Sequence, residues 1–358
     1  MKKSVKTSAA ALLATAIILS LTACDPPMPP DVAAQIAEQT YTCEPGEANV
    51  VASAEMADPV ASWQSALPMS CVDPLPAMSI TSDSSLPADL LISAQEPTPE
   101  VCSAFASAPI AVDSANIAFS LSVTSSLNLT PATAAKILNG EITNWNDPAI
   151  AKENVGTEFP DLAITIVKPA EKLAFDALSN WFDRLGAPIQ TGKFELSSGT
   201  DIATYSALAE GAVAIVPGSY AMSLGLYSAS IQTGIDKSTG DAILANADNS
   251  GITSAATQWK PSASGDNVTV ELDPNLKPLI PAGFDFAAEP YQAIYPVKLF
   301  LCGDDNLLKR AVANYLLRLD SQGSLGVSNF NQLNEETRTL SLVTLRKGLP
   351  EPTAAPGK

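Results

Sequence analysis

The clearest alternation of apolar and polar positions lies between residues 128 and 182. Thr130–Asn139 has apolar residues at helical spacing, and a polar segment separates it from the continuous apolar run Leu162–Val167. The loop Lys168–Phe175 follows, and then a second helix-like segment that includes Trp181. Periodic segments predict helices, and a short apolar run predicts a buried strand. This order predicts half of an α/β lobe, in which ligands bind at the loop that leaves the strand.

Shorter apolar runs precede this segment. Ala48–Ser53 and Ala77–Thr81 are predicted strands, and between them lies a predicted helix at Pro59–Ala66 with Asp58 as its N-cap. The loosely alternating stretch Ala108–Leu121 has the pattern of a strand that crosses a hinge.

The C-terminal half has fewer long apolar runs. A helix is predicted at 201–210, and the apolar run 211–220 is predicted as the strand that follows it. Asn267–Leu272 and Tyr291–Cys302 are predicted strands, and Asp304–Leu319 has the apolar spacing of a helix.

One part of the central segment resembles a known family. The run Ile137-Leu-Asn-Gly-Glu-Ile-Thr-Asn-Trp-Asn-Asp-Pro-Ala-Ile150 is similar to the phosphate-binding proteins that serve ABC phosphate importers. The resemblance extends over residues 48–346 and is dense around 129–167 and 291–326. It implies an α/β fold of the two-lobed periplasmic-binding-protein type (type II), in which each lobe is a mixed sheet flanked by helices and hinge strands join the lobes.

The resemblance also implies a division of the chain. We expect a lipoprotein signal peptide at 1–24, a Pro-rich tether at 25–44, a discontinuous first lobe at 45–125 and 222–347, a second lobe at 126–221, and a disordered tail at 348–358.

The phosphate loop of the family is replaced in this chain. Where the family has Arg-Ser-Asp-Gly-Ser-Gly-Thr-Thr, this chain has Lys168-Pro-Ala-Glu-Lys-Leu-Ala-Phe175. Four positions carry side chains without a hydrogen-bond donor: Pro169, Ala170, Leu173 and Phe175. Lys168 is still a candidate ligand for an anion, and Glu171 is a candidate for the role of the family's aspartate, although a solvated loop explains both. We therefore predict that phosphate binding is altered or lost.

Other candidate ligands lie in loops that correspond to glycine-rich turns of the family. The hydroxyls of Ser53, Ser84 and Ser85 remain, but the glycines that let backbone N–H groups close on an anion do not. A second group precedes the predicted helix at 201–210, where the helix dipole favours an anion: Ser198, Gly199 and Thr200. Ordinary loop and capping roles are the alternative for all of them.

The first 24 residues have the pattern of an export signal. Three lysines precede the apolar core Ala9–Leu21, which is too short for a stable membrane span. Leu21-Thr-Ala-Cys24 resembles a bacterial lipobox, in which the cysteine becomes lipidated; an ordinary signal peptide with a chance cysteine is the alternative. We expect lipidated Cys24 to anchor the chain at the extracytoplasmic face of the cell membrane, because two acyl chains anchor stably where one does not.

Composition excludes several classes of function. The chain has 20 Lys and Arg against 38 Asp and Glu, a formal charge of −18 that becomes about −21 without the three signal lysines. We expect no nucleic-acid partner, because neutralisation of phosphates dominates such binding. The chain contains no histidine, which excludes Ser-His-Asp and Cys-His catalysis and histidine-based metal sites. We expect no cofactor and no metal.

Four cysteines remain besides Cys24, and they lack the spacing of a metal site: Cys43, Cys71, Cys102 and Cys302. An even number in an exported chain predicts two disulfides, for which three pairings are possible. We favour Cys43–Cys71 with Cys102–Cys302, since the first bond would join the start of the first strand to the end of the following helix.

Three classes of function are open. The first is a lipid-anchored, monomeric solute-binding protein that closes on a small anion or another small solute and serves an ABC permease. The second is a sensor, adaptor or surface-interaction protein on the same fold. The third, a hydrolase, lacks a Ser-x-x-Lys or comparable signature, and without histidine few nucleophile systems are open to it. We therefore expect that the protein is not an enzyme.

Overall fold

The computed structural model describes residues 42–73, 75–199, 201–279 and 288–350. Its strands are β1 (Gly46–Ala52), β2 (Met78–Thr81), β3 (Leu90–Ser93), β4 (Ala104–Phe119), β5 (Asn128–Leu129), β6 (Thr165–Ile166), β7 (Pro169–Glu171), β8 (Glu195–Ser197), β9 (Ala212–Pro217), β10 (Tyr227–Ser228), β11 (Ser230–Ile235), β12 (Ala242–Ala245), β13 (Trp259–Ser264), β14 (Asn267–Leu272) and β15 (Ile294–Cys302).

The α-helices are α3 (Ala57–Ser70), α4 (Pro131–Leu138), α5 (Pro148–Glu153), α6 (Lys172–Arg184), α7 (Gly218–Ser223), α8 (Asn249–Ala256), α9 (Leu307–Leu316), α10 (Leu319–Gln322) and α11 (Glu335–Leu345). The 3₁₀ turns are η1 (Ala54–Met56), η2 (Thr191–Lys193), η3 (Ile202–Thr204) and η4 (Gly323–Ser328).

The long strand β4 pairs with different partners along its length. Its first part runs antiparallel to β15 as far as Ser114, and from Ala115 onward it pairs with β9. The main sheet has the order β13-β14-β4-β15-β3-β1-β2, and β6, β9 and β10 join it through the second part of β4. Parallel pairs of β1 with β2 and β3 stand beside antiparallel pairs of β15, so the sheet is mixed, as predicted.

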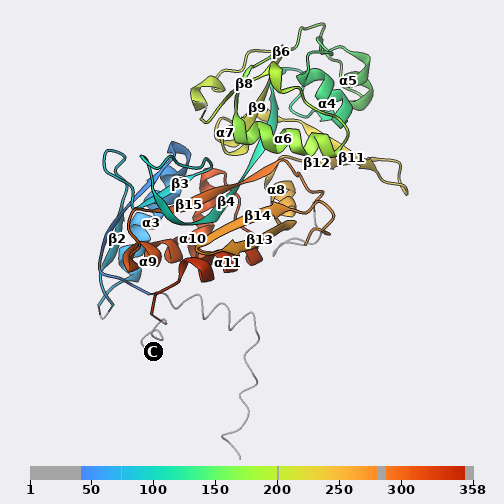
Figure 1. Cartoon of the computed structure of the whole chain (residues 1–358). Coiled ribbons are helices and arrows are strands. Elements are labelled where there is room, and N and C mark those ends of the chain that lie inside the picture. The colour runs from blue at the N-terminus through green and yellow to red at the C-terminus, as the bar shows by residue number, and fades with distance from the viewer. Residues whose placement is uncertain (1–41, 74, 200, 280–287, 351–358) are drawn as a thin grey trace, which may run out of the picture. The chain divides into compact units, whose positions relative to one another are not determined.

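Helices flank this sheet. Figure 1 shows α9, α10 and α11 along one side of it; α9 contacts β1 and β15, and α11 contacts β4, β13 and β14. The helix α6 packs on β4, β9 and β15. Its buried side chains, among them Phe175, Trp181 and Phe182, belong to one apolar cluster with residues of α4 and β9.

The segment that carries the family resemblance is stabilised by helix caps and by a buried tryptophan. Thr130 caps α4 by accepting a hydrogen bond from the Thr133 N–H at 3.2 Å, and Asp147 caps α5 by accepting one from the Ala149 N–H at 2.8 Å. Between them Trp145 is fully buried, and its Nε1–H donates to the Gly211 carbonyl at 3.1 Å. Caps and a satisfied buried indole each stabilise the fold.

Two disulfides join the four described cysteines in the favoured pairing. Cys43 and Cys71 have Cα atoms 5.8 Å apart and link the residue ahead of β1 to the end of α3. Cys102 and Cys302 have Cα atoms 5.0 Å apart and link the start of β4 to the end of its neighbour β15.

Some predicted elements differ from the structure. Asp58 lies in the first turn of α3, and its N-cap is Met56, because the helix follows directly on η1. The predicted helix at 201–210 contains only η3, in a stretch where threonine, tyrosine and serine lower helix propensity. β11, from the segment 222–347 expected for the first lobe, pairs in parallel with β5, from the segment 126–221 expected for the second, and the division into lobes stays a prediction.

Candidate functional site

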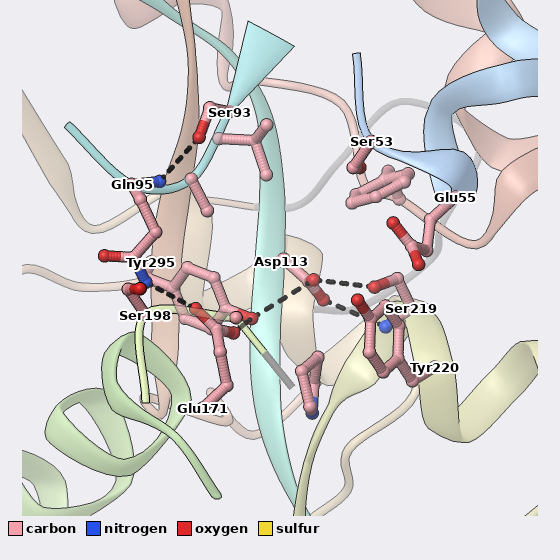
Figure 2. A pocket seen from close by; sticks show the side chains of 15 residues that line it. Ser53, Glu55, Ser93, Gln95, Asp113, Glu171, Ser198, Ser219, Tyr220 and Tyr295 are labelled. Atoms are coloured by element: carbon pink, nitrogen blue, oxygen red, sulfur yellow. Dashed lines mark hydrogen bonds between the residues drawn. The ribbon is translucent and has the colours of Figure 1, made fainter. Parts of the chain in front are cut away.

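A cavity of about 150 Å³ lies among the ends of β3, β7 and β9 and the middle of β4 and β15. Figure 2 shows its side chains arranged around Asp113, with Gln95, Tyr295 and Glu171 on one side and Glu55, Ser219 and Tyr220 on the other. The residues that line it are Ser53, Glu55, Ser93, Ala94, Gln95, Asp113, Glu171, Ser198, Gly199, Pro217, Ser219, Tyr220, Tyr295, Val297 and Phe330.

Asp113 is a buried carboxylate in the middle of an apolar strand. Its Oδ1 accepts from the backbone N–H groups of Ser114 at 2.7 Å and Ser219 at 3.0 Å. Its Oδ2 accepts from the Ser219 hydroxyl at 2.8 Å and the Tyr295 hydroxyl at 3.2 Å. A buried carboxylate needs such partners because desolvation is unfavourable. The donors that converge here are therefore already occupied by a carboxylate of the chain itself.

Glu171 is the second buried carboxyl group. Its Oε1 accepts from the Gln95 amide at 2.6 Å, and its Oε2 lies 3.4 Å from the Tyr295 hydroxyl oxygen. The tyrosine has one hydroxyl proton and two carboxyl groups beside it, so it cannot donate to both. If Glu171 carries a proton, it can donate to the Tyr295 oxygen while Tyr295 donates to Asp113, and every group is satisfied.

The pKa values agree with this arrangement. Burial raises the pKa of Glu171 to about 7, and the charge of Asp113 adds to the rise against the opposing hydrogen bond from Gln95. Burial also raises the pKa of Asp113, although its hydrogen bonds from Ser219 act in the other direction. Burial raises the pKa of Tyr295 well above its usual value, so this phenol is neutral and acts as a donor.

A third carboxylate, Glu55 of η1, lies at the half-buried edge of the cavity. Burial, and then the nearby charge of Glu55, raise the pKa of Tyr220. Among the described residues that line the cavity, three are acidic and none is lysine or arginine. The electrostatic character of the cavity is therefore negative.

One helix N-terminus near the cavity is also occupied by a carboxylate. Asp113 accepts from the Ser219 N–H in the first turn of α7, whereas Glu171, the N-cap residue of α6, makes no side-chain capping hydrogen bond. Such N–H groups and the helix dipole are what an external anion would use. At α7 the chain supplies its own anion instead.

The structure brings together some of the residues predicted from the sequence. Ser53, Glu171, Ser198 and Gly199 line the cavity, whereas Ser84, Ser85 and Lys168 do not. Ser85 instead donates through its N–H and its hydroxyl to Asp83 in an exposed turn. Thr200 and Cys24 lie outside the described residues.

The predicted loop Lys168–Phe175 is not a loop. Pro169–Glu171 forms β7, which pairs in parallel with β8, and α6 begins directly at Lys172. Lys168 is exposed, and Lys172 is exposed and pairs with Asp176. Ala170 and Phe175 are buried in the apolar cluster of α6. This pairing of β7 turns Glu171, and neither lysine, into the cavity.

Sequence analysis missed Asp113, Tyr295, Ser219, Tyr220, Gln95 and Glu55. Asp113 had a detectable signal, because a carboxylate inside an apolar strand must be paired or functional. Tyr295 lies in a run whose pattern indicates only a strand, and neither Gln95, in the loop after β3, nor Glu55, in η1, carries a local signal.

The described residues contain no cluster of three or more acidic or cysteine side chains arranged to hold a metal ion. Across the same residues, no helix combines the length and apolarity of a membrane span.

The fold and the cavity define a class: an α/β protein with a mixed sheet flanked by helices. A small polar cavity lies beside the long strand β4 of that sheet. A similar fold occurs in the ancestral soluble variant of the human phosphate-binding protein, with a TM-score of 0.50, 11% identity, and 82% of this chain and 93% of that chain covered. It also occurs in a high-affinity periplasmic phosphate-binding protein, PfluDING, solved with phosphate, with a TM-score of 0.50, 11% identity, and 82% of this chain and 92% of that chain covered. These structures confirm the type II fold.

Curated sequences lead to the same family. The chain is 28% identical over 237 residues to phosphate-binding protein PstS 3 of Mycobacterium leprae, which covers 62% of this chain and 60% of that protein. It is 28% identical over 197 residues to PstS 3 of Mycobacterium tuberculosis, with 52% of each chain covered. The matches thus span less than two thirds of these relatives, and no protein-family model matches the chain. They confirm the resemblance to phosphate-binding proteins, which are named for binding rather than for catalysis.

Proposed function

We propose that this chain is a solute-binding protein, not an enzyme, that acts as a monomer at an ABC permease and whose cavity no longer holds phosphate. The observation that carries the proposal is the lining of the cavity, with three carboxylates and no lysine or arginine among the described residues. An oxyanion site needs several N–H or hydroxyl donors and often an arginine.

The hydrogen bonds support the loss of phosphate. The Ser219 and Tyr295 hydroxyls donate to Asp113, and the Gln95 amide donates to Glu171. Phosphate would have to displace these bonds and approach two carboxyl groups. Each charge-assisted bond that phosphate fails to gain weakens binding by roughly 1.5–3 kcal/mol, so three occupied donors amount to about 4.5 kcal/mol, or about three decades of affinity.

We propose that the cavity lies between two lobes that close about β4. Gln95 belongs to the segment 45–125 expected for the first lobe, and its partner Glu171 belongs to the segment 126–221 expected for the second. The change of partner along β4, from β15 to β9 after Ser114, supports a hinge at this position. The pairing of β11 with β5 supports extending the second lobe through β12.

Lipidation of Cys24, followed by the Pro-rich tether, would hold the protein on the extracytoplasmic face of the cell membrane. The basic start, the apolar core and the small residues before Cys24 support this part of the proposal. An anchored receptor stays within reach of a permease in the same membrane.

Titration calorimetry with phosphate tests the loss of that ligand. We expect no binding tighter than about 1 mM at pH 6 or pH 8, with the phosphate-bound PfluDING protein as the positive control. A micromolar dissociation constant for phosphate would contradict the proposal, and its loss in Ser198→Ala or in Lys168→Ala would identify the replaced side chain as a ligand.

A further inference from the structure

We infer that the cavity takes a small organic cation, an ammonium group that carries a short alkyl or hydroxyalkyl chain. This inference rests on the proposed function as a solute-binding protein and names its class of ligand. It stands on three independent properties of the cavity: its hydrogen-bonding groups, its aromatic walls and its size.

The first property is the balance of donors and acceptors. The Ser219 N–H and hydroxyl, the Tyr295 hydroxyl and the Gln95 amide all donate to carboxyl groups of the cavity. The charged groups that line the cavity are all carboxyl groups, and the hydroxyls of Ser53, Ser198 and Tyr220, which can donate or accept, lie beside them. A ligand that supplies N–H donors or positive charge complements them, and an anion or a pure acceptor does not.

The second property is the aromatic wall. Tyr220, Tyr295 and Phe330 line the same cavity as the three carboxylates. Tyr295 and Phe330 are 6% and 5% exposed, so their rings are held in place by the surrounding core. The face of an aromatic ring attracts ammonium groups, and quaternary ammonium ligands are recognised by several rings together.

The third property is the volume. A cavity of about 150 Å³ matches one that holds benzene, so it suits a ligand of about six to eight non-hydrogen atoms. A bare metal ion would leave most of this space and the aromatic walls unused. The described residues also contain no cluster of three acidic or cysteine side chains arranged for a metal.

Two matched pairs of probes isolate the positive charge. Choline and 3,3-dimethyl-1-butanol have the same shape and differ by the charged nitrogen, and ethanolamine and ethylene glycol form a smaller pair of the same kind. Each probe, together with phosphate and erythritol, is titrated into the full-length protein at pH 8, where Glu171 is ionised, and at pH 6. Calorimetry gives the dissociation constant, and thermal unfolding gives an independent measure of binding.

We expect at least one cation to bind with a submillimolar dissociation constant and at least tenfold more tightly than its neutral partner. Binding at pH 8 should exceed binding at pH 6. Glu55→Gln lies at the half-buried edge and should leave the fold intact; it should weaken the cation about tenfold and leave the neutral partner unchanged. Glu195→Gln, on the exposed strand β8, is the matched control and should have no effect.

Other outcomes distinguish a wrong ligand class from a wrong proposed function. If erythritol or a neutral partner binds as tightly as the cations, the inference is wrong and the solute-binding function stands. Micromolar binding of phosphate overturns both the inference and the proposed loss of phosphate. If none of the probes binds to the folded protein, the inference is wrong, and the solute-binding function is left to ligands of another class.

Discussion

The raised pKa of Glu171 predicts that the stability of this protein depends on pH through one side chain. The folded state holds the proton of Glu171 more tightly than the unfolded chain, whose carboxyl titrates near 4.5. The groups that face it are Asp113 from β4, Tyr295 from β15, Tyr220 from α7 and Gln95 after β3. None of them is a cation that would stabilise the ionised form.

The sign and size of the effect follow from linkage. Because the pKa is raised on folding, the stabilising contribution is fully present below pH 4.5 and is lost as the pH rises through about 7. Complete ionisation removes about 3 kcal/mol, and the change between pH 5 and pH 8 is roughly 2.5 kcal/mol. Glu171→Gln keeps the shape of the protonated acid, with an acceptor for Gln95 and a donor for Tyr295, and it does not ionise.

Urea unfolding of the disulfide-intact protein, followed by tryptophan fluorescence at pH 5, 6, 7 and 8, measures this contribution. The difference in free energy of unfolding between Glu171→Gln and the parent should grow with pH by roughly 2.5 kcal/mol in favour of the variant. Glu195→Gln should show a difference that does not change with pH. If the Glu171→Gln difference is also independent of pH, the arrangement in which protonated Glu171 donates to Tyr295 is wrong.

Three further predictions concern other parts of the chain. Asp113→Ala should lower the free energy of unfolding in urea by about 2–4 kcal/mol, because four donors lose their acceptor. Asp113→Asn should lower it less, since its amide oxygen can accept from the two N–H groups and its amide nitrogen can donate to the two hydroxyl oxygens. Equal losses in the two variants would contradict this geometry. Removal of the Cys43–Cys71 bond, by replacing both cysteines with serine, should lower stability by about 3–4 kcal/mol, given the separation of 28 residues; an unchanged urea midpoint would argue against it. Cys24→Ser should abolish metabolic labelling with a fatty acid, and labelling that persists would exclude Cys24 as the site.

The sequence by itself determined much of the fold. Periodic apolar positions located α4 and α6, and short apolar or alternating segments located β1, β2, β14 and β15, because burial on one or both faces imposes these patterns directly. The run Ile137–Ile150 pointed to the phosphate-binding proteins to which the chain is similar, although none of its residues lines the cavity. Trp145 of this run packs in the core, and the helix caps beside it stabilise α4 and α5. Such features depend on residues close together in the sequence, so the sequence alone shows them.

The cavity was decided by tertiary structure. Its carboxylates come from η1, β4 and the end of β7, and Tyr295 comes from β15, nearly two hundred residues after Asp113. The sequence suggested both Lys168 and Glu171 as candidates in one loop, and in the structure, where β7 pairs with β8, only Glu171 lines the cavity. The type of a residue shows whether it can bind a ligand. Which residues lie together in one cavity is determined by the register of the strands and by the path of the chain between them. The charge of the cavity is a sum over such distant residues, so only the folded chain defines it.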